Sequence, residues 1–383
     1  MLSRRLASTV AASGSNASSR KIVLVGTGFL ASYIVRSLVA DPRNRVLLVS
    51  RNPQTLYNKV SSLGSQILPP QSCDITSPNT ASLQKALEGA DAVVSMVGLL
   101  VANEQKMIDV QQKGAERVAK VAKEQGVGRV VMVSAIGADP GGVTPYQRTK
   151  AAAEEAFLRE NPQSTIIRPS IIFGPGDSFF TRFATLAKYL PFLPVFGGGV
   201  VRFQPVYAGD VARAIEICCR DDPKVVDLVG GKIIEAGGPD VFTYKEIMQL
   251  VLKYSGLQGR RLILSLPYWV GMVQGFFLEK LPESIFTVTR DQIKQLRSDN
   301  VVTISSPTPL NSVDFEQLLA AFPSSLPTSA PPGDAGLTSV YKSLPTYLGP
   351  KKAPESGKRT HGRGVEDTLE EVRRMSNAGK KTP

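Results

Sequence analysis

Histidine is almost absent from this sequence, whose 383 residues include only His361. A Ser-His-Asp triad or a His-ligated metal centre in a folded core is therefore excluded, and we predict no metal site. The three cysteines are Cys73 and the adjacent pair Cys218 and Cys219, which form no CxxC motif. They do not match a secreted disulfide framework and favour a compartment that keeps thiols reduced.

Acidic residues are missing from the amino-terminal segment: none precedes Asp41, whereas Arg4, Arg5 and Arg20 are basic. An Arg-rich, Ser-rich, acid-free start is typical of a mitochondrial transit peptide, and we assign residues 1–20 to one. The alternative is an ordinary amino-terminal tail. The formal net charge of +12 lies largely in the two chain ends. The body between them lacks the basic cluster of a nucleic-acid interface, so we predict no nucleic-acid partner.

Uncharged runs of about 20 residues, the length of a membrane-spanning helix, are also lacking. The nearest candidate runs from Leu262 to Leu278 and is interrupted by Pro267. Trp269 and Phe276 lie at helical spacing within it, so we predict an amphipathic helix after the proline. Its apolar face either packs on the core or contacts a partner protein or a membrane surface.

What the sequence does contain is apolar material for a core, with 42% hydrophobic and 20% charged residues. The first apolar run, residues 21–25, is followed directly by Gly26-Thr27-Gly28 and then by a helical pattern. Gly26 permits a tight turn, Gly28 lets a pyrophosphate approach the backbone, and Ala31 lets the helix pack on the strand. The helix amino terminus would then face the phosphates. This order of strand, glycine turn and helix predicts a dinucleotide site.

Arg51 follows the next apolar strand, residues 45–50, where an NAD-preferring site usually has Asp or Glu. An arginine at this position suits a ribose 2′-phosphate, so NADP(H) is favoured over NAD(H). The alternative is that Arg51 only faces solvent.

The alternation of strands and helices continues through Asp91–Val97, a helix over Glu104–Gln125 and the strand Arg129–Ser134. Repeated βα units predict an α/β fold, a Rossmann-type doubly wound parallel sheet with a small carboxyl-terminal substrate or partner lobe. We assign residues 21–175 to the NAD(P)-binding core and 176–348 to the rest of the fold and the lobe. Residues 349–383 are rich in Gly, Lys and Arg and form a basic tail outside the fold.

Ser134, Tyr146 and Lys150 are the candidate catalytic residues. Tyr146 and Lys150 are four residues apart at the start of a predicted helix, so their side chains share one face. A nearby ammonium would lower the pKa of the phenol and allow it to act as a general acid or base. Ser134 ends the preceding strand, and its hydroxyl could orient the carbonyl group on which the phenol would act.

These motifs together resemble the short-chain dehydrogenase/reductase superfamily, in its extended or atypical branch. The resemblance rests on GTGFLA, VSAIGA, YQRTK, RPSIIFG and QPVY, and it covers about residues 21–348. Within that branch, TRDQI, SDNVV and LPTYL are similar to the 39/40-kDa accessory-subunit family of respiratory complex I and its relatives in coenzyme Q biosynthesis. Val25, Ala31 and Ser95 depart from residues that are frequent in extended members, which weakens the match of the phosphate loop.

The resemblance implies a tightly bound NADPH and a place on the matrix side of the inner mitochondrial membrane. It implies partners among complex I subunits or coenzyme Q biosynthesis proteins, with a peripheral membrane contact. Whether the protein is an enzyme stays open: NADPH is either structural, or it reduces a quinone-like or isoprenoid carbonyl. The residues expected to line the cofactor are Gly26, Thr27, Gly28, Phe29, Leu30, Arg51, Asp74, Gly98, Tyr146, Lys150, Arg168, Pro169 and Ser170.

Overall fold

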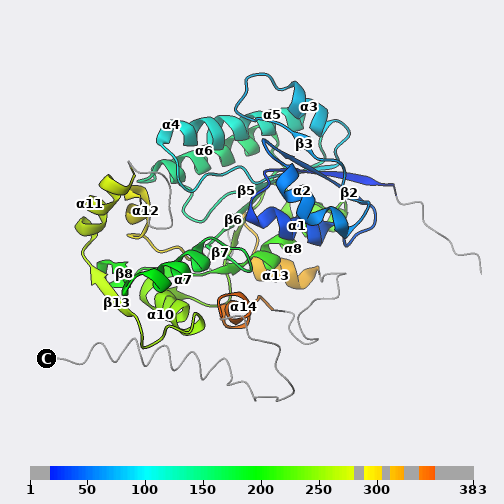
Figure 1. The fold of residues 1–383 in the computed structure, drawn as a ribbon. Coiled ribbons are helices and arrows are strands. Elements are labelled where there is room, and N and C mark those ends of the chain that lie inside the picture. Colours follow the sequence, from blue (N-terminus) through cyan, green and yellow to red (C-terminus); the bar gives the residue numbers. More distant parts are fainter. Residues whose placement is uncertain (1–17, 280–288, 304–310, 323–335, 350–383) are drawn as a thin grey trace, which may run out of the picture.

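A parallel sheet of seven strands forms the centre of the molecule, in the order β11-β6-β5-β4-β1-β2-β3 (Figure 1). The computed structural model describes residues 18–279, 289–303, 311–322 and 336–349. The predicted α/β class and doubly wound parallel sheet are confirmed. The strands are β1 (Arg20–Val25), β2 (Asn44–Ser50), β3 (Gln71–Ser72), β4 (Ala92–Ser95), β5 (Arg129–Val133), β6 (Thr165–Pro169) and β11 (Ile233–Ala236).

Both faces of this sheet are covered by helices, which explains why its strands are continuous apolar runs. In β1, Ile22 and Leu24 face one core and Val23 and Val25 face the other. The first core includes side chains of α1 (Phe29–Leu38), α2 (Gln54–Val60), α8 (Ala208–Cys218), α9 (Pro223–Val229) and α13 (Phe315–Ala321). The second includes side chains of α3 (Ala81–Leu87), α5 (Ala115–Glu124) and α6 (Pro145–Glu160). The chain enters α5 through α4 (Glu104–Met107) and a π-helical turn, Ile108–Gly114.

The order of the strands reverses beside β1: β2 and β3 follow on one side, and β4, β5 and β6 on the other. A crevice forms at such a switch point, outside the carboxyl ends of the strands, and ligands of open α/β sheets bind there. The fold therefore brings the ends of β1, β2, β4, β5 and β6 to one edge of the sheet, where nearly all the predicted site residues lie.

A smaller lobe follows β6 and surrounds a third apolar core. It includes short strand pairs, of which β8 and β13 are parallel, as are β7 and β10, whereas β9 and β12 are antiparallel. Its strands are β7 (Ile172–Phe173), β8 (Phe192–Phe196), β9 (Arg202–Phe203), β10 (Val206–Tyr207), β12 (Phe242–Thr243) and β13 (Leu262–Leu266). Its helices are α7 (Phe179–Tyr189), α10 (Tyr244–Tyr254), α11 (Tyr268–Leu278), α12 (Arg290–Gln295) and α14 (Val340–Tyr347).

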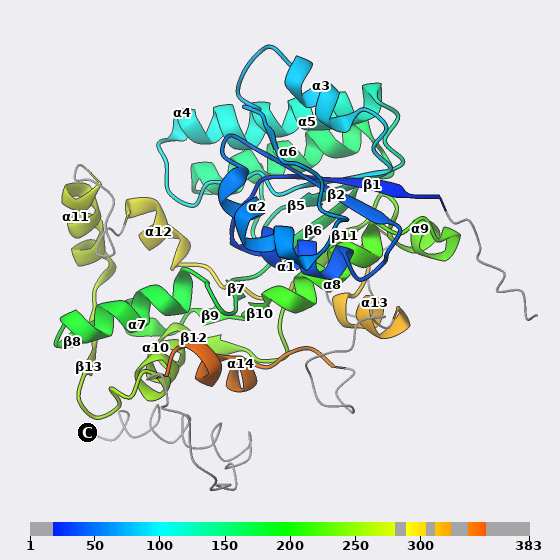
Figure 2. The same cartoon turned by 45° about the vertical axis from the view of Figure 1, so that its right-hand side comes forward.

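Helix α11 confirms the helix predicted after Pro267, and with α12 it lies at the end of the molecule away from α9 (Figure 2). Its buried residues are Gly271 and Gly275, which pack close to α12 and its flanking residues. The side chain of Trp269 is 67% exposed and that of Phe277 63%. The alternative in which the aromatic face packs on the core is therefore wrong. In the part of the chain described, every helix is too short or too polar to cross a bilayer.

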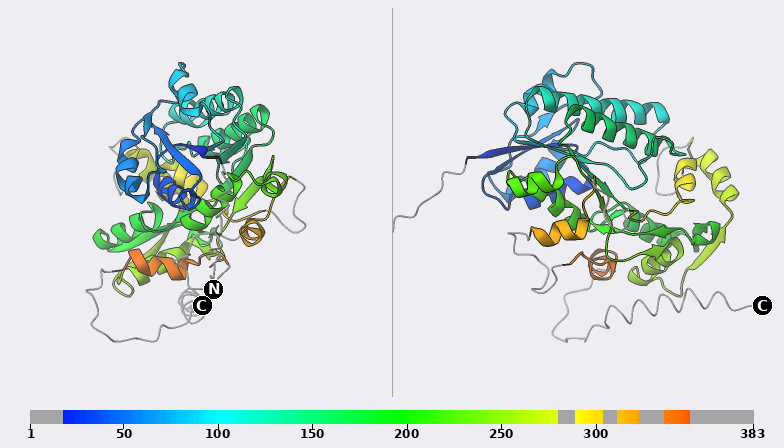
Figure 3. Two further views of the ribbon diagram at one scale, coloured as in Figure 1. Left: turned by 90° about the vertical axis from the view of Figure 1, so that its right-hand side faces the viewer. Right: turned by 180° about the vertical axis from the view of Figure 1, so that it is seen from behind.

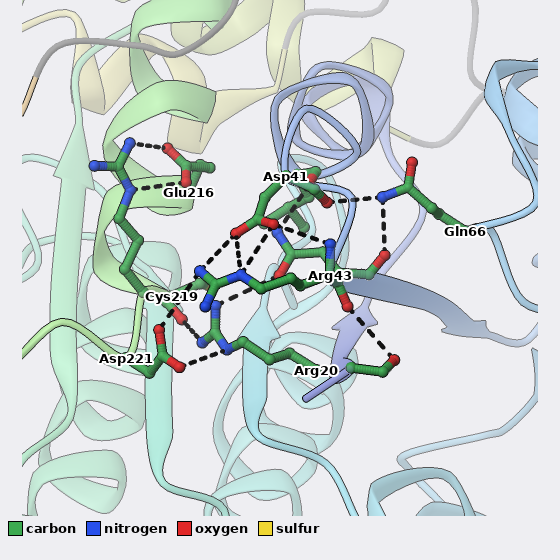
Figure 4. A network of polar contacts seen from close by, with 11 residues as sticks. Arg20, Asp41, Arg43, Gln66, Glu216, Cys219 and Asp221 are labelled. Atoms are coloured by element: carbon green, nitrogen blue, oxygen red, sulfur yellow. Dashed lines mark hydrogen bonds and ion pairs between the residues drawn. The ribbon is translucent and has the colours of Figure 1, made fainter. Parts of the chain in front are cut away.

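Arg20 belongs to the folded body and not to the predicted transit-peptide segment, residues 1–20. It is the first residue of β1 and only 4% exposed. Its guanidinium donates to the carbonyl of Cys219 and to the side-chain oxygen of Asn44, and it lies 3.6 Å from the Asp221 carboxylate (Figure 4). The folded body thus begins one residue earlier than we expected. Residues 1–17 and the tail from residue 350 lie outside the described residues.

Candidate functional site

The glycine turn after β1 stands at the predicted place, and its two glycines serve different purposes. Gly26 has a φ of 108°, a left-handed conformation that favours glycine, and a Cβ there would lie 3.3 Å from the Met96 carbonyl oxygen. Gly28 has an ordinary φ of −73°, and a Cβ there would meet no atom within 4 Å. Nothing within the described protein therefore requires glycine at position 28. The open space lies at the amino terminus of α1, whose first backbone N–H groups receive no side-chain cap.

The neighbouring strand end supplies a polar surface suited to the adenosine half of a dinucleotide. The hydroxyls of Thr27 and Ser50 are hydrogen-bonded at 2.8 Å, joining the glycine turn to the end of β2. Arg51 is exposed, and its guanidinium makes no hydrogen bond or ion pair with the described residues. The Asp74 carboxylate accepts bonds from the hydroxyl and backbone N–H of Thr76, which lower its pKa.

Phe29 and Leu30 occupy the first turn of α1 but differ in their surroundings. Leu30 is buried in the core beneath the helix, so its side chain is a packing residue. Phe29 lies on the outer side, with its ring edge-to-face to Tyr33 at 5.2 Å, and it borders Gly176 of the following lobe. Only the backbone of this turn, together with Phe29, is available to a ligand.

Lys150 is bound to the sheet. Its ammonium donates to the carbonyls of Val97 and Val133, at 2.9 and 3.0 Å, and so joins the ends of β4 and β5. Burial lowers its pKa to about 8, while the nearby Glu154 opposes that shift. Burial raises the pKa of Tyr146 to about 12, and Lys150 does not counteract it. In this structure burial dominates the pKa of the phenol, and its activation by the ammonium stays a prediction.

Two buried hydroxyls at the ends of β4 and β5 lack any partner in the structure. They belong to Ser95, which is 1% exposed, and Ser134, which is 4% exposed. A buried hydroxyl without a partner costs about 1–3 kcal/mol, so such groups usually mark the place of a ligand or water. The open space at Gly28 and these hydroxyls lie along the same carboxyl edge of the sheet, and both fit a bound dinucleotide.

Gln111 is a site residue that sequence reasoning missed. It is fully buried in the π-helical turn, where its amide accepts from the Leu99 N–H and donates to the Thr149 hydroxyl, both at 3.2 Å. A Cβ on Gly98 would lie 3.5 Å from its side-chain oxygen and 3.2 Å from the Lys150 nitrogen. Gly98 thus allows the β4 loop to pass closely over Lys150. The sequence carries no local signal for this, since an isolated glutamine in a helical pattern is ordinarily a surface residue.

At the end of β6, the polar side chains predicted to line the cofactor form ion pairs and hydrogen bonds with other residues of the protein. The Arg168 guanidinium binds the Glu154 carboxylate at 2.6 Å and lies 3.8 Å from Glu235. These carboxylates raise its pKa. The Ser170 hydroxyl donates to Asn300, and the Pro169 carbonyl accepts from Ile136 N–H at 3.0 Å. Any contact of these three residues with a cofactor stays a prediction.

The geometry defines a Rossmann-type, NAD(P)H-binding class of protein, and comparisons with known proteins agree. Residues 26–178 match a family model described as NAD(P)H-binding, and residues 139–257 match that of the 3-beta hydroxysteroid dehydrogenase/isomerase family. Among solved structures, a Citrobacter triphenylmethane reductase in complex with NADP(H) shares the fold, with a TM-score of 0.60 and 18% identity. The match covers 85% of this chain and 99% of that one.

Sequence comparison identifies the family itself. The chain is 32% identical over 302 residues to the mitochondrial NADH dehydrogenase (ubiquinone) 1 alpha subcomplex subunit 9 of Arabidopsis thaliana, covering 77% of this chain and 72% of that protein. It is 27% identical over 231 residues to the mitochondrial NADH-ubiquinone oxidoreductase 40 kDa subunit of Neurospora crassa, covering 60% and 58%. The chain therefore belongs to this family of atypical short-chain dehydrogenase/reductase proteins.

Proposed function

We propose that this protein is an accessory subunit of mitochondrial respiratory complex I and holds one NADP(H) as a permanent structural part. The observation that carries the proposal is a contrast along the carboxyl edge: Gly28 faces open space and two buried hydroxyls lack partners, whereas Lys150 is already bound by the sheet. The 32% identity to a complex I subunit of Arabidopsis thaliana, over 77% of this chain, also supports the proposal. Helix α11 would then present its exposed aromatic side chains to neighbouring subunits or to the matrix-side membrane surface.

In this proposal each part of the crevice holds one part of the dinucleotide. The backbone from Gly26 to Leu30 would bind the pyrophosphate at the amino terminus of α1. Arg51, which has no ion-pair partner among the described residues, would bind a ribose 2′-phosphate and so favour NADP(H) over NAD(H). Tyr146 and the unpaired hydroxyls of Ser95 and Ser134 would face the nicotinamide half.

The state of the catalytic candidates supports a structural role for the cofactor. General acid catalysis is most effective when the pKa of the acid lies near the working pH. Burial instead raises the pKa of Tyr146 to about 12, and the ammonium that should lower it is hydrogen-bonded to Val97 and Val133. When bound, the dinucleotide could supply hydride chemistry, but this chain's own residues are arranged to hold it.

The test follows the endogenous protein in mitochondria. After gentle detergent extraction and native separation, mass spectrometry of each slice should find it together with complex I subunits. Introduced in place of the wild type, Gly28→Val should reduce this co-migration, because the valine side chain would fill the open space at α1. Tyr146→Phe should leave it unchanged, since the phenol hydroxyl is not needed to bind a structural cofactor.

Three outcomes would contradict the proposal. The protein could migrate as a small free species, or with coenzyme Q biosynthesis enzymes. Alternatively, Gly28→Val could leave assembly intact while abolishing a reductase activity. Each result would move the assignment to an NAD(P)H-dependent reductase acting on a quinone-like or isoprenoid carbonyl, whose substrate-dependent NADPH oxidation should then disappear in Tyr146→Phe.

A further inference from the structure

The SDNVV motif of the sequence lies in a segment that joins two distant parts of the molecule. This linking segment, residues 296–303, leaves the end of α12 and reaches the carboxyl ends of β6 and β11. Figure 3 shows α11 and α12 in yellow at one end of the molecule, beyond the sheet edge. The function proposed above does not use the motif, so its contacts call for a separate explanation.

At its inner end the linking segment is bound to the sheet edge through Asn300. The Ser170 hydroxyl donates to the side-chain oxygen of Asn300 at 2.6 Å and lies 3.1 Å from its carbonyl. The Asn300 N–H donates to the Arg202 carbonyl at 2.8 Å, and its carbonyl accepts from Gln204 N–H at 3.0 Å. One residue thus joins the end of β6 to β9 and to the residue that follows β9.

The same segment is also connected to Lys150 through a series of hydrogen bonds and ion pairs between charged side chains. Thr303 donates its backbone N–H and its hydroxyl to Glu235, at 2.7 and 2.9 Å. Glu235 lies 3.8 Å from Arg168, which binds Glu154 at 2.6 Å. Glu154 is one helical turn from Lys150 and stabilises its charged form. Hydrogen bonds and ion pairs therefore connect the segment to Glu154, which lies one helical turn from Lys150.

At its outer end the segment is bound to α11. The Tyr268 hydroxyl donates to the Leu296 carbonyl at 2.8 Å, and the Arg297 guanidinium lies over the Tyr268 ring, 5.1 Å from its centroid. Gly271 and Gly275 allow α11 to pack closely on Ile293 and Arg290. The Arg290–Glu279 ion pair at 2.9 Å and the close approach of Gly271 to Phe196 also hold these helices, while most large side chains of α11 face outward.

We propose that Asn300 is a positioning residue that couples the dinucleotide site to helices α11 and α12. In this proposal the dinucleotide also contacts the end of β6, as predicted for Ser170, and restrains it. The hydrogen bond from Ser170 to Asn300 then restrains the linking segment, whose outer end is bound to Tyr268. The exposed aromatic face of α11 would then be held in one arrangement only in the dinucleotide-bound protein. This inference rests on the dinucleotide binding proposed above.

Hydrogen–deuterium exchange of the purified full chain, with and without saturating NADPH, tests the coupling. In the wild type, peptides covering α11 and α12 should exchange several-fold more slowly with NADPH bound. Asn300→Ala should remove that difference, whereas Asn300→Asp, which keeps an oxygen acceptor for Ser170, should retain most of it. Asn161→Ala is the matched control, since it deletes a 2.9 Å bond to the Ala119 carbonyl far from the segment.

A second readout uses the single tryptophan of the chain, Trp269, which lies on α11. Binding of NADP⁺ should change its accessibility to acrylamide in the wild type and in Asn161→Ala, but not in Asn300→Ala. Loss of the Ser170–Asn300 bond from the dinucleotide-bound state should also weaken NADPH binding in Asn300→Ala, by about 3- to 10-fold. If Asn300 variants do not fold, Tyr268→Phe breaks the outer contact and should reduce the protection of α11.

The outcomes separate the two proposals. If NADPH binds, as measured by calorimetry, but leaves exchange in α11 and α12 unchanged, the coupling is wrong and the proposed function stands. Full ligand-dependent protection in Asn300→Ala would also overturn the coupling. If neither NADPH nor NADH binds, both the structural cofactor and the coupling are wrong.

Discussion

The two edges of the central sheet are built differently, although the same strands form both. At the amino edge, buried arginines bind the last carbonyls of α8. Arg20 donates to the carbonyl of Cys219 (Figure 4). Arg129 donates to that of Cys218, although one of its guanidinium nitrogens has no partner in the structure. At the carboxyl edge, the hydroxyls of Ser95 and Ser134 are buried without partners, and Gly28 faces open space. Unpaired buried polar groups cost stability, and at the carboxyl edge a bound dinucleotide would satisfy these two hydroxyls.

This difference shows where stability and binding reside. Arginines at the carboxyl end of a helix interact favourably with its dipole as well as with its last carbonyls. The amino edge therefore stabilises the fold, whereas the carboxyl edge contributes binding capacity. Variants of the two edges should have opposite consequences, and each expectation below tests that separation.

Replacement of Arg20 should have the largest effect on folding. Arg20→Met leaves the Cys219 carbonyl and the Asn44 side chain without their buried donor, which should lower the free energy of unfolding by about 3 kcal/mol. Urea denaturation measures this loss, and calorimetry should find NADPH affinity unchanged. Arg43→Met is the control, because this partly exposed arginine pairs mainly with Asp41 and should cost no more than about 1 kcal/mol. A loss of affinity without a loss of stability in Arg20→Met would refute the division between the edges.

Gly28→Val should produce the reverse pattern. No protein atom lies within 4 Å of a Cβ at this position, so the free energy of unfolding should change by less than about 1 kcal/mol. The valine would occupy the space before the α1 amino terminus, and NADPH affinity should fall about 100-fold, or about 2.7 kcal/mol. Gly26→Ala is a useful contrast, since its φ of 108° makes the substitution destabilising in itself. Unaltered NADPH binding in Gly28→Val would place the cofactor elsewhere.

Lys150 predicts a specific pH dependence of stability in the dinucleotide-free protein. Its pKa is lowered from 10.5 to about 8 by burial. Between these values the unfolded chain binds more protons than the folded one, so this contribution to stability rises with pH. From pH 7.5 to 9.5, wild type should gain of order 1–2 kcal/mol relative to Lys150→Met. Parallel stability curves for the two proteins across this range would show that the lysine titrates normally.

Arg51→Ala should have the smallest effect of these substitutions, and it tests whether the protein prefers NADPH to NADH. If Arg51 binds the 2′-phosphate, its removal should weaken NADPH about tenfold, or about 1.4 kcal/mol, and leave NADH affinity nearly unchanged. Calorimetric titration with both dinucleotides measures the ratio of the two affinities. Lys59→Ala serves as a control for the loss of one positive charge, as Lys59 lies in the last turn of α2. An equal loss of affinity for NADPH and NADH would mean that Arg51 does not bind the ribose 2′-phosphate.

Much of the fold could be predicted because its signals are local. The strand before Gly26, the turn to Gly28 and the apolar positions of α1 follow one another within a few residues, and the structure reproduces them. The helix after Pro267 was predicted for the same reason. The start of β1 at Arg20 was missed, since nothing in the local sequence separates a presequence arginine from one buried against α8.

The polar partners of the site could not be predicted in this way. Tyr146 and Lys150 stand one helical turn apart as expected, yet the lysine binds the carbonyls of Val97 and Val133 on two different strands. Arg168 binds Glu154 and lies near Glu235, which come from a helix and a strand far apart in the chain. Such pairs depend on how the elements pack, not on the spacing of residues.

The sequence by itself determined the class of fold, the glycine turn and the family, because strand and helix periodicities and short motifs are properties of neighbouring residues. The tertiary structure decided which polar groups are paired and which are free. It left Ser95 and Ser134 unpaired, bound Lys150 to the sheet, and exposed Trp269 at the end of the molecule. The physical reason is that burial and hydrogen bonding are set by groups brought together through space, across 199 residues in the case of Arg20 and Cys219.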